Sequence, residues 1–154
     1  YGPRQRLDLT VNILTNHAVN NGKITVFGGS QRRPNIHIDD MVELYVRSMD
    51  YADDAIDGQI FNAGYENQQV MEIAETVRDV IGNSVDIAVT STDDLRSYHI
   101  SSERIKSHLG FEPTHSIGQA VEDLAAAFAA GRIPDSLTDP RYFNVKVMQE
   151  LGLH

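Results

Sequence analysis

Apolar residues recur at helical spacing along five stretches of the chain, with polar residues between them. Because an α-helix turns once in about 3.6 residues, this spacing predicts amphipathic helices with one buried side. The predicted helices cover residues 7–18, 41–49, 70–81, 101–109 and 117–128. Glycine follows shortly after most of them, where a left-handed residue often ends a helix. A loop and a short helix are expected from Pro134 onward.

Short apolar runs separate the helices and predict strands. These strands cover residues 23–27, 34–38, 58–63 and 85–89. The turn Gly28-Gly29-Ser30 ends the first of them, and Asp39 or Asp40 is the expected cap of the helix that follows the second. Ser116 and Gln119 have the spacing of a capping box at the start of the last long helix. Since short strands alternate with helices, the predicted fold class is α/β.

The composition is that of an ordinary globular domain of 154 residues. A formal net charge of −9 argues against a protein that mainly coats nucleic acid or an anionic membrane. The lack of cysteine excludes disulfides, a thiolate nucleophile and cysteine-ligated zinc, and it fits the cytoplasm, where we expect the protein. No apolar run reaches the roughly 20 residues of a membrane span.

Arginine dominates the basic residues, with 10 Arg and 3 Lys. A guanidinium group binds a phosphate or carboxylate through two parallel hydrogen bonds, so this excess permits anion recognition. Arg32 and Arg33 follow the glycine turn, where a strand end can present them to a diphosphate; a solvated turn with surface ion pairs is the alternative. Arg96 follows Asp93 and Asp94, so a local ion pair is the alternative there.

Other common site patterns are missing from the sequence. The glycine turn lacks the Gly-Lys-Ser/Thr ending of a P-loop, and no dinucleotide-binding glycine pattern opens a strand–helix unit. His37 with Asp39 offers two metal ligands at most, so no metal site is predicted. Tyr142 and Lys146 have the spacing of a dehydrogenase acid–base pair, but their place near the C-terminus indicates a coincidence. We therefore predict no complete catalytic site in this chain.

Four segments stand in an order that is more informative than any of them alone. They are YGPR at 1–4, ITVFGGSQRRPNIHIDD at 24–40, FNAG at 61–64 with the helix at 70–81, and DLR at 94–96 with LGFEP at 109–113. Together they resemble the extended short-chain dehydrogenases/reductases, the family of NAD(P)-dependent nucleotide-sugar epimerases and dehydratases.

The resemblance implies that residues 1–154 are the C-terminal half of such an enzyme, a single substrate-binding portion of an α/β Rossmann-type fold. The start at Tyr1, in a turn and without an initiator Met, fits this interpretation. The dinucleotide-binding half, with NAD or NADP and the catalytic residues, would precede Tyr1. The segments at 34–38 and 58–63 would join its sheet. Their exposed edges favour binding of that missing Rossmann half or self-association as a homo-oligomer.

The resemblance also implies roles for individual residues. Arg33 and Arg96 match the two arginines that clamp the diphosphate of a nucleotide-sugar substrate. Asn12 resembles a helix asparagine that contacts the substrate, and Asn62 matches a position beside the nucleotide. His37 matches a residue that packs where the strand meets its helix, which predicts a structural role.

The family implies a reaction in which hydride leaves the sugar for the nicotinamide and returns, which makes the enzyme an oxidoreductase or an isomerase. Epimerase, dehydratase and reductase are alternatives, as are NAD and NADP, and the nucleotide and sugar stay open. A different interpretation is a non-catalytic nucleotide-sugar-binding or interaction module without a cofactor site of its own.

Overall fold

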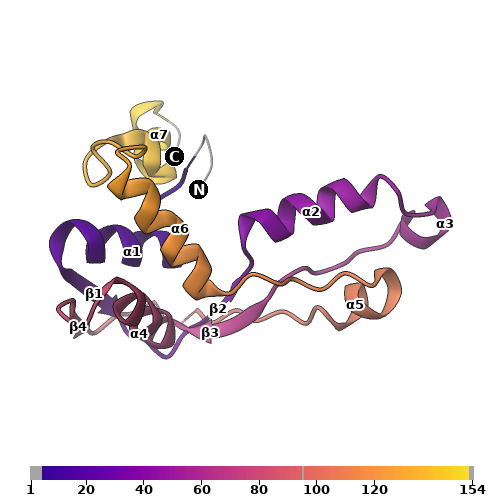
Figure 1. Cartoon of the computed structure of the whole chain (residues 1–154), viewed down its shortest axis with the longest axis horizontal. Coiled ribbons are helices and arrows are strands. Elements are labelled where there is room, and N and C mark those ends of the chain that lie inside the picture. The colour runs from indigo at the N-terminus through magenta and orange to yellow at the C-terminus, as the bar shows by residue number, and fades with distance from the viewer. Residues whose placement is uncertain (1–4, 95, 153–154) are drawn as a thin grey trace.

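The computed structural model of the chain describes residues 5–94 and 96–152, so the predicted turn at 1–4 lies outside the described residues. The fold is mixed α/β, in agreement with the predicted class (Figure 1). In chain order the elements are α1 (Thr10–Asn21), β1 (Lys23–Phe27), β2 (Arg32–Asn35), α2 (Ile38–Ser48), α3 (Asp53–Ile56), β3 (Glu66–Gln69), α4 (Val70–Ile81), β4 (Asp86–Thr90), α5 (Glu103–Leu109), α6 (Ile117–Ala129), the 3-10 helix η1 (Pro140–Tyr142) and α7 (Asn144–Glu150). None of the helices in these two ranges is long and apolar enough to cross a membrane.

The strands form two small sheets, and each sheet joins segments that are distant in the sequence. β1 and β4 pair in parallel, beginning with Lys23 opposite Asp86. β2 and β3 pair in the antiparallel direction, beginning with Arg32 opposite Gln69. The second sheet therefore places the arginine-rich strand beside polar residues of β3.

We call α1, α4, α6, β1 and β4 the body of the molecule, because these elements share one apolar core. The buried core residues are Leu14, Ala18, Ile24, Val26, Ile73, Ala74, Val77, Val85, Ile117 and Val121. Burying a large aliphatic side chain contributes roughly 1.5–3 kcal/mol, so these contacts hold the body together. A second apolar cluster attaches the C-terminal segment to α6; it consists of Leu7, Leu124, Ala127 and Ile133.

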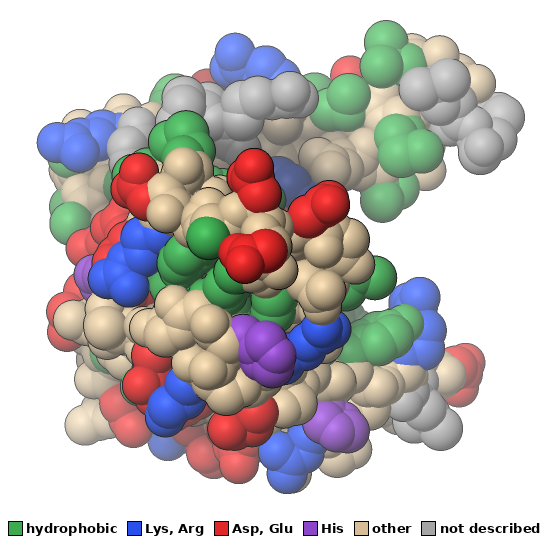
Figure 2. Space-filling view, turned by 90° about the vertical axis from the view of Figure 1, so that its right-hand side faces the viewer, with side chains coloured by type: hydrophobic (Ala, Val, Ile, Leu, Met, Phe, Trp, Pro, Cys, Tyr) green, Lys and Arg blue, Asp and Glu red, His purple; other side chains and the backbone are tan. Residues whose placement is uncertain are grey.

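Two arms extend from one side of the body, as Figure 1 shows. The first arm consists of α2 and α3, and the second consists of α5 with the chain on either side of it. The first arm exposes a row of large apolar side chains on α2 and its C-cap Met49, namely Ile38, Val42, Tyr45, Val46 and Met49. Figure 2 views the molecule from the side toward which the arms extend and shows apolar side chains exposed among charged ones.

The ends of three helices follow the predicted signals in the sequence. The helix predicted at 70–81 is confirmed as α4. The capping box at the start of α6 is also confirmed, because the hydroxyl of Ser116 accepts a hydrogen bond from the backbone of Gln119. α1 ends at Gly22, whose φ of 62° is a left-handed conformation that glycine adopts without strain. These boundaries depend on residues that are close in the sequence.

The strand predicted at 58–63 is wrong. Among the described residues, that run forms no strand, and the nearest strand is β3. A strand needs a neighbour that shares its hydrogen bonds, and the neighbour of β2 here is β3. Ile60, in the apolar run, is consequently 79% exposed.

The strand predicted at 34–38 lies slightly earlier, as β2. Ile38 is already the first residue of α2, and His37 caps this helix by accepting a hydrogen bond from the backbone N–H of Asp39 at Nδ1, at 3.2 Å. The prediction that Asp39 or Asp40 is the cap is therefore wrong. Asp40 lies instead in a buried hydrogen-bond cluster.

Candidate functional site

Arg33 lies in β2, beside the segment that follows β4. Its Nη1 donates hydrogen bonds to the backbone oxygens of Arg32, at 2.9 Å, and of Arg96, at 2.7 Å. Its Cζ lies 5.5 Å from the ring centroid of Tyr98, within the range of a cation–π contact. The structure thus brings together the segments of Arg33 and Arg96, which are 63 residues apart in the sequence.

Arg96 forms a bidentate ion pair with Asp94. Its Nε donates to Oδ1 and its Nη2 donates to Oδ2, both at 2.7 Å. The hydrogen bonds from Arg96 hold the pKa of the Asp94 carboxyl well below its usual value, and those to Asp94 raise the pKa of the guanidinium. The local ion pair weighed as an alternative is therefore present. Because a guanidinium has five N–H donors, the pair leaves donors of Arg96, whose side chain is 71% exposed, for a second anion.

Residues 97–100, which follow β4, are held against β2 and β3 by hydrogen bonds. The backbone N–H of Arg32 donates to Ser97 Oγ at 2.9 Å, and the N–H of Tyr98 donates to the Arg32 oxygen at 3.0 Å. The side-chain amide of Asn67, in β3, bonds both the oxygen and the N–H of Ile100, at 2.9 and 2.8 Å. Sequence reasoning missed these contacts, because no local spacing indicates that this segment lies along β2.

A cavity of about 570 Å³ lies next to Arg33, between α1, β2, the start of α2 and α6. Asn12 and Arg33 both line it, whereas neither Arg96 nor Asn62 is among the described lining residues. Nδ2 of Asn12 donates to the backbone oxygen of Arg6 at 2.7 Å. Asn62 is exposed in the segment between α3 and β3. Arg33 thus shares the cavity with Asn12 and also binds the backbone of Arg96. Asn62 lies apart from the cavity.

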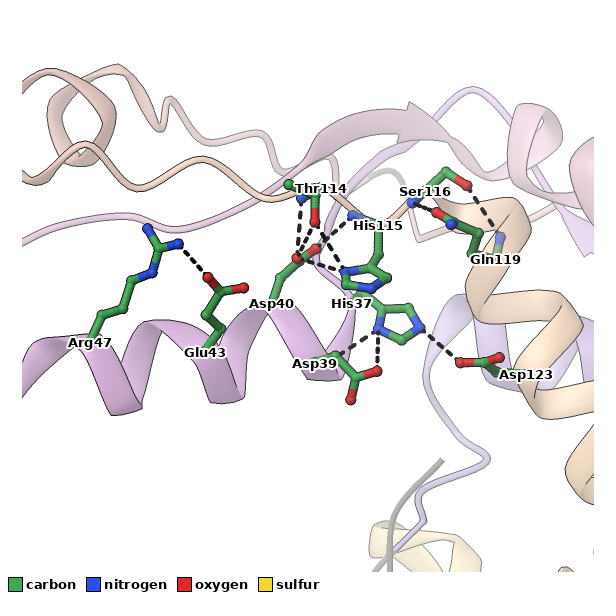
Figure 3. Close-up of polar contacts among 10 residues, drawn as sticks. All are labelled: His37, Asp39, Asp40, Glu43, Arg47, Thr114, His115, Ser116, Gln119 and Asp123. Atoms are coloured by element: carbon green, nitrogen blue, oxygen red, sulfur yellow. Dashed lines mark hydrogen bonds and ion pairs between the residues drawn. The ribbon is translucent and has the colours of Figure 1, made fainter.

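A buried polar cluster fastens the start of α2 to the start of α6 (Figure 3). Asp40 is 1% exposed and accepts hydrogen bonds from the N–H and hydroxyl of Thr114 and from the N–H and ring of His115, at 2.8–3.2 Å. The His115 ring stacks on His37 with 4.8 Å between the centroids. The geometry gives His37 the structural place, between strand and helix, that its sequence position predicts.

Two pKa values shift in this cluster. Burial raises the pKa of Asp40, but the hydrogen bonds from His115 and Thr114 outweigh burial and lower it below its usual value. The hydrogen bond to Asp40 raises the pKa of His115, against the opposing effect of desolvation. The two groups are therefore oppositely charged over a wider pH range than the isolated side chains.

His37, Asp39 and Asp123 place three candidate metal-ligand atoms within 4.8 Å of one another. Nδ1 of His37 accepts the helix-cap hydrogen bond, and Nε2 faces the Asp123 carboxylate at 3.5 Å. Both ring nitrogens thus have protein partners, and both carboxylates are largely exposed. We assign the imidazole to the helix junction and no metal to the group.

The glycine turn after β1 does not fit a dinucleotide. A pyrophosphate is typically held where a glycine-rich turn leads from a strand into the N-terminus of a helix. Here the turn at 28–30 leads from β1 into β2, and the N–H of Gly29 donates to Oε1 of Gln31 at 2.7 Å. The turn therefore lacks the helix N-terminus that would hold a pyrophosphate.

Tyr142 and Lys146 lie on different elements, the first in η1 and the second in α7. The ammonium group of Lys146 lies 4.2 Å from the ring centroid of Phe143. The spacing of Tyr142 and Lys146 therefore does not place them on one helix face, which agrees with the interpretation as a coincidence.

Residues 1–64 match the model of the NAD dependent epimerase/dehydratase family. The family resemblance predicted from the sequence is confirmed. The match includes α1, β1, β2 and α2, and it contains the candidate site residues Asn12, Arg33 and Asn62.

Solved structures of epimerases and related enzymes share this fold. The UDP-glucose 4-epimerase of Thermotoga maritima, solved with UDP-glucose, matches 85% of this chain with a TM-score of 0.71 and 22% identity, over 43% of its own length. The UDP-glucuronic acid 4-epimerase of Bacillus cereus, solved with UDP-glucuronic acid and NAD, matches 84% with a TM-score of 0.71 and 22% identity, over 42% of its length. L-threonine dehydrogenase of Phytophthora infestans matches 79% with a TM-score of 0.69 and 13% identity, over 41% of its length.

The chain thus spans about two fifths of the length of these structures. Their substrates differ in kind, since one is an amino-acid dehydrogenase and two are nucleotide-sugar epimerases. The likeness therefore shows the epimerase/dehydratase type of fold, and the substrate has to be argued from the site.

Proposed function

We propose that this chain binds a nucleotide-sugar, as the C-terminal, substrate-binding portion of an NAD(P)-dependent epimerase or dehydratase. The 2.7 Å hydrogen bond from Arg33 Nη1 to the backbone oxygen of Arg96 carries the proposal, because it brings two cationic segments to one place. Two guanidinium groups on adjacent segments suit a diphosphate, which offers several charged oxygens. The family match and the nucleotide-sugar epimerases of similar fold support this ligand.

In the proposed complex the two arginines bind the diphosphate and Asn12 contacts the substrate from the cavity wall. Asn62 is assigned to the nucleotide. Fixing the diphosphate also fixes the position of the attached sugar, and such orientation accelerates a reaction whose other groups come from elsewhere. Bound NAD(P) supplies hydride acceptance and return, and we place its binding half outside this chain.

Calorimetric titration of the 154-residue chain with UDP-glucose, UDP-glucuronic acid and NAD tests the proposal. We expect a nucleotide-sugar to bind and NAD not to bind tightly. Arg33→Ala and Arg96→Ala should each raise the Kd of the nucleotide-sugar roughly tenfold or more, because each removes charge-assisted hydrogen bonds to phosphate. In an enzyme that contains both halves, the same variants should raise KM for the nucleotide-sugar and spare NAD(P) binding.

Arg141→Ala is the matched control. Arg141 forms the same kind of bidentate pair with Asp139, two residues before it, in η1 and away from β2. Its loss should leave nucleotide-sugar binding unchanged. Unchanged binding in both Arg33→Ala and Arg96→Ala contradicts the diphosphate site. Micromolar binding of NAD to this chain contradicts the placement of the cofactor outside it.

A further inference from the structure

Gln31 is a buried polar side chain in the turn between β1 and β2, two residues before Arg33; it is 6% exposed. Its Oε1 accepts a hydrogen bond from the N–H of Gly29 at 2.7 Å. Its Nε2 donates to the backbone oxygens of Phe27, at 3.0 Å, and of Asp94, at 3.1 Å. One amide thus joins the end of β1, the glycine turn and the segment that follows β4, with its buried polar atoms satisfied.

The glycine turn is shaped around this amide. Gly28 has a φ of 77°, and a Cβ at this position would lie 2.6 Å from Nε2 of Gln31. Only glycine therefore combines the backbone conformation with space for the amide. The N–H of Gly28 donates to the oxygen of Thr90 at 2.8 Å, which ties the turn to the end of β4. The amide is consequently held by the paired strands of the body.

The bond from Gln31 to Asp94 connects the body to Arg96. The backbone oxygen of Asp94 accepts a hydrogen bond from the buried amide of Gln31, and its carboxylate binds the exposed guanidinium of Arg96. Two hydrogen bonds to Arg32 hold the far end of the same segment. Gln31 fixes its near end, where the ion pair lies.

We propose that Gln31 is a positioning residue of the diphosphate site, which orients Arg96 through Asp94; this inference rests on the proposed function. Without the amide, the Asp94–Arg96 pair loses its anchor on the body. The Arg96 guanidinium then samples positions in which it no longer meets the same diphosphate as Arg33, and binding weakens.

UDP is a suitable probe, because it carries the diphosphate without the sugar. Gln31→Met keeps the length of the side chain and removes its hydrogen bonds, and we expect the Kd of UDP to rise about tenfold. Asn16→Leu is the matched control. Asn16 is also a buried amide that ties two distant segments, but its bonds of 3.1 and 2.7 Å go to Ser136, whereas Gln31 binds Asp94 beside Arg96. The control variant should lower Tm and leave the Kd of UDP unchanged.

The Arg96→Ala background separates positioning from general loosening of the fold. If Gln31 acts through Arg96, Gln31→Met weakens UDP binding when Arg96 is present and adds little when it is absent. Equal weakening in both backgrounds overturns the inference, as does an unchanged Kd of UDP in Gln31→Met alone.

Amide hydrogen exchange gives a readout that needs no ligand. The N–H of Arg96 donates to Oδ1 of Asp94 at 3.2 Å, so it should exchange faster in Gln31→Met while α4 keeps its protection. Unaltered exchange at Arg96 overturns the inference. If the unaltered chain binds neither UDP nor a nucleotide-sugar, the proposed function fails, and the role of Gln31 in a diphosphate site fails with it.

Discussion

Two amphipathic helices of nearly equal length, α4 in the body and α2 in the first arm, lie in opposite environments. α4 has 12 residues and packs its apolar side, including Ile73 and Val77, into the shared core. α2 has 11 residues, and among its described side chains the buried one is Asp40, while Tyr45 and the C-cap Met49 are exposed. The body is therefore held by apolar burial and the attachment of the first arm by hydrogen bonds to one carboxylate.

The contrast teaches that amphipathic spacing predicts a helix but not the surface it packs against. Both helices have the apolar periodicity from which they were predicted. α4 packs against α1 and α6 of the same chain. In contrast, the apolar row of α2 is exposed, and Met49 at its end is 77% exposed. What decides burial is the presence of a neighbour, and that is a property of the fold.

The largest expected effect separates the two apolar surfaces. Ile73→Ala should lower the free energy of unfolding by about 3–4 kcal/mol, because it leaves a cavity in a fully buried core. Met49→Ala, on the exposed side of α2, should stay within about 0.5 kcal/mol of the unaltered chain. Urea unfolding measures both. Similar losses for the two variants would show that α2 is also buried in solution and would remove the contrast.

A smaller effect is expected where the first arm meets the body. Asp40→Asn keeps the shape of the side chain but removes the charge that binds His115 and Thr114, and it should cost about 1–3 kcal/mol. The amides of α2 should exchange faster, while those of α4 keep their protection. Asp39→Asn removes a largely exposed carboxylate that lies beside the same junction without hydrogen-bonding His115; it is the control and should change both far less than Asp40→Asn. Equal loss of protection in α4 contradicts a local attachment.

The smallest effect is a pH dependence of the same junction. Because the folded pKa of His115 is raised, its contribution is complete below about pH 6.5 and is lost as pH rises through the folded pKa. Because the folded pKa of Asp40 is lowered, its contribution is complete above about pH 4 and is lost as pH falls through its folded pKa. The negative charges of Asp39 and Asp123 also raise the pKa of His115.

The attachment of α2 should therefore be strongest between roughly pH 4 and 6.5. The exchange rate of α2 amides, divided by that of α4 amides at each pH, measures it without the intrinsic pH dependence of exchange. His115→Gln should abolish the weakening above this window. A ratio that does not change with pH in the unaltered chain refutes the prediction.

Features that depend on neighbouring residues could be predicted from the sequence. The capping box of Ser116 and Gln119 and the helix end at Gly22 need partners within a few residues, and both were found. The strand at 58–63 failed, because an apolar run becomes a strand only beside a partner. The cap of α2 failed for a similar reason, since Asp40 has its partners 74 and 75 residues away.

The candidate site divides in the same way. Arg33 and Arg96 followed from the family resemblance, and the structure brings their segments together. Gln31 and Tyr98 were missed, because the contacts that give them a place in the site join residues far apart in the sequence. Gln31 binds Asp94, 63 residues away, and Tyr98 lies beside Arg33 of β2. No spacing within a short window contains such information.

The parallel pairing of β1 with β4 has a further consequence for how the chain can vary. Pairing these two strands closes the intervening chain, residues 28–85, into one long loop in the topological sense. The first arm is part of that intervening chain. The entropy of closing such a loop grows only with the logarithm of its length, by about 0.6 kcal/mol for each doubling. Insertions and deletions at the tip of the first arm should therefore cost the body little stability. The tip of the first arm should thus tolerate changes in chain length while β2, with Arg32 and Arg33, keeps its position.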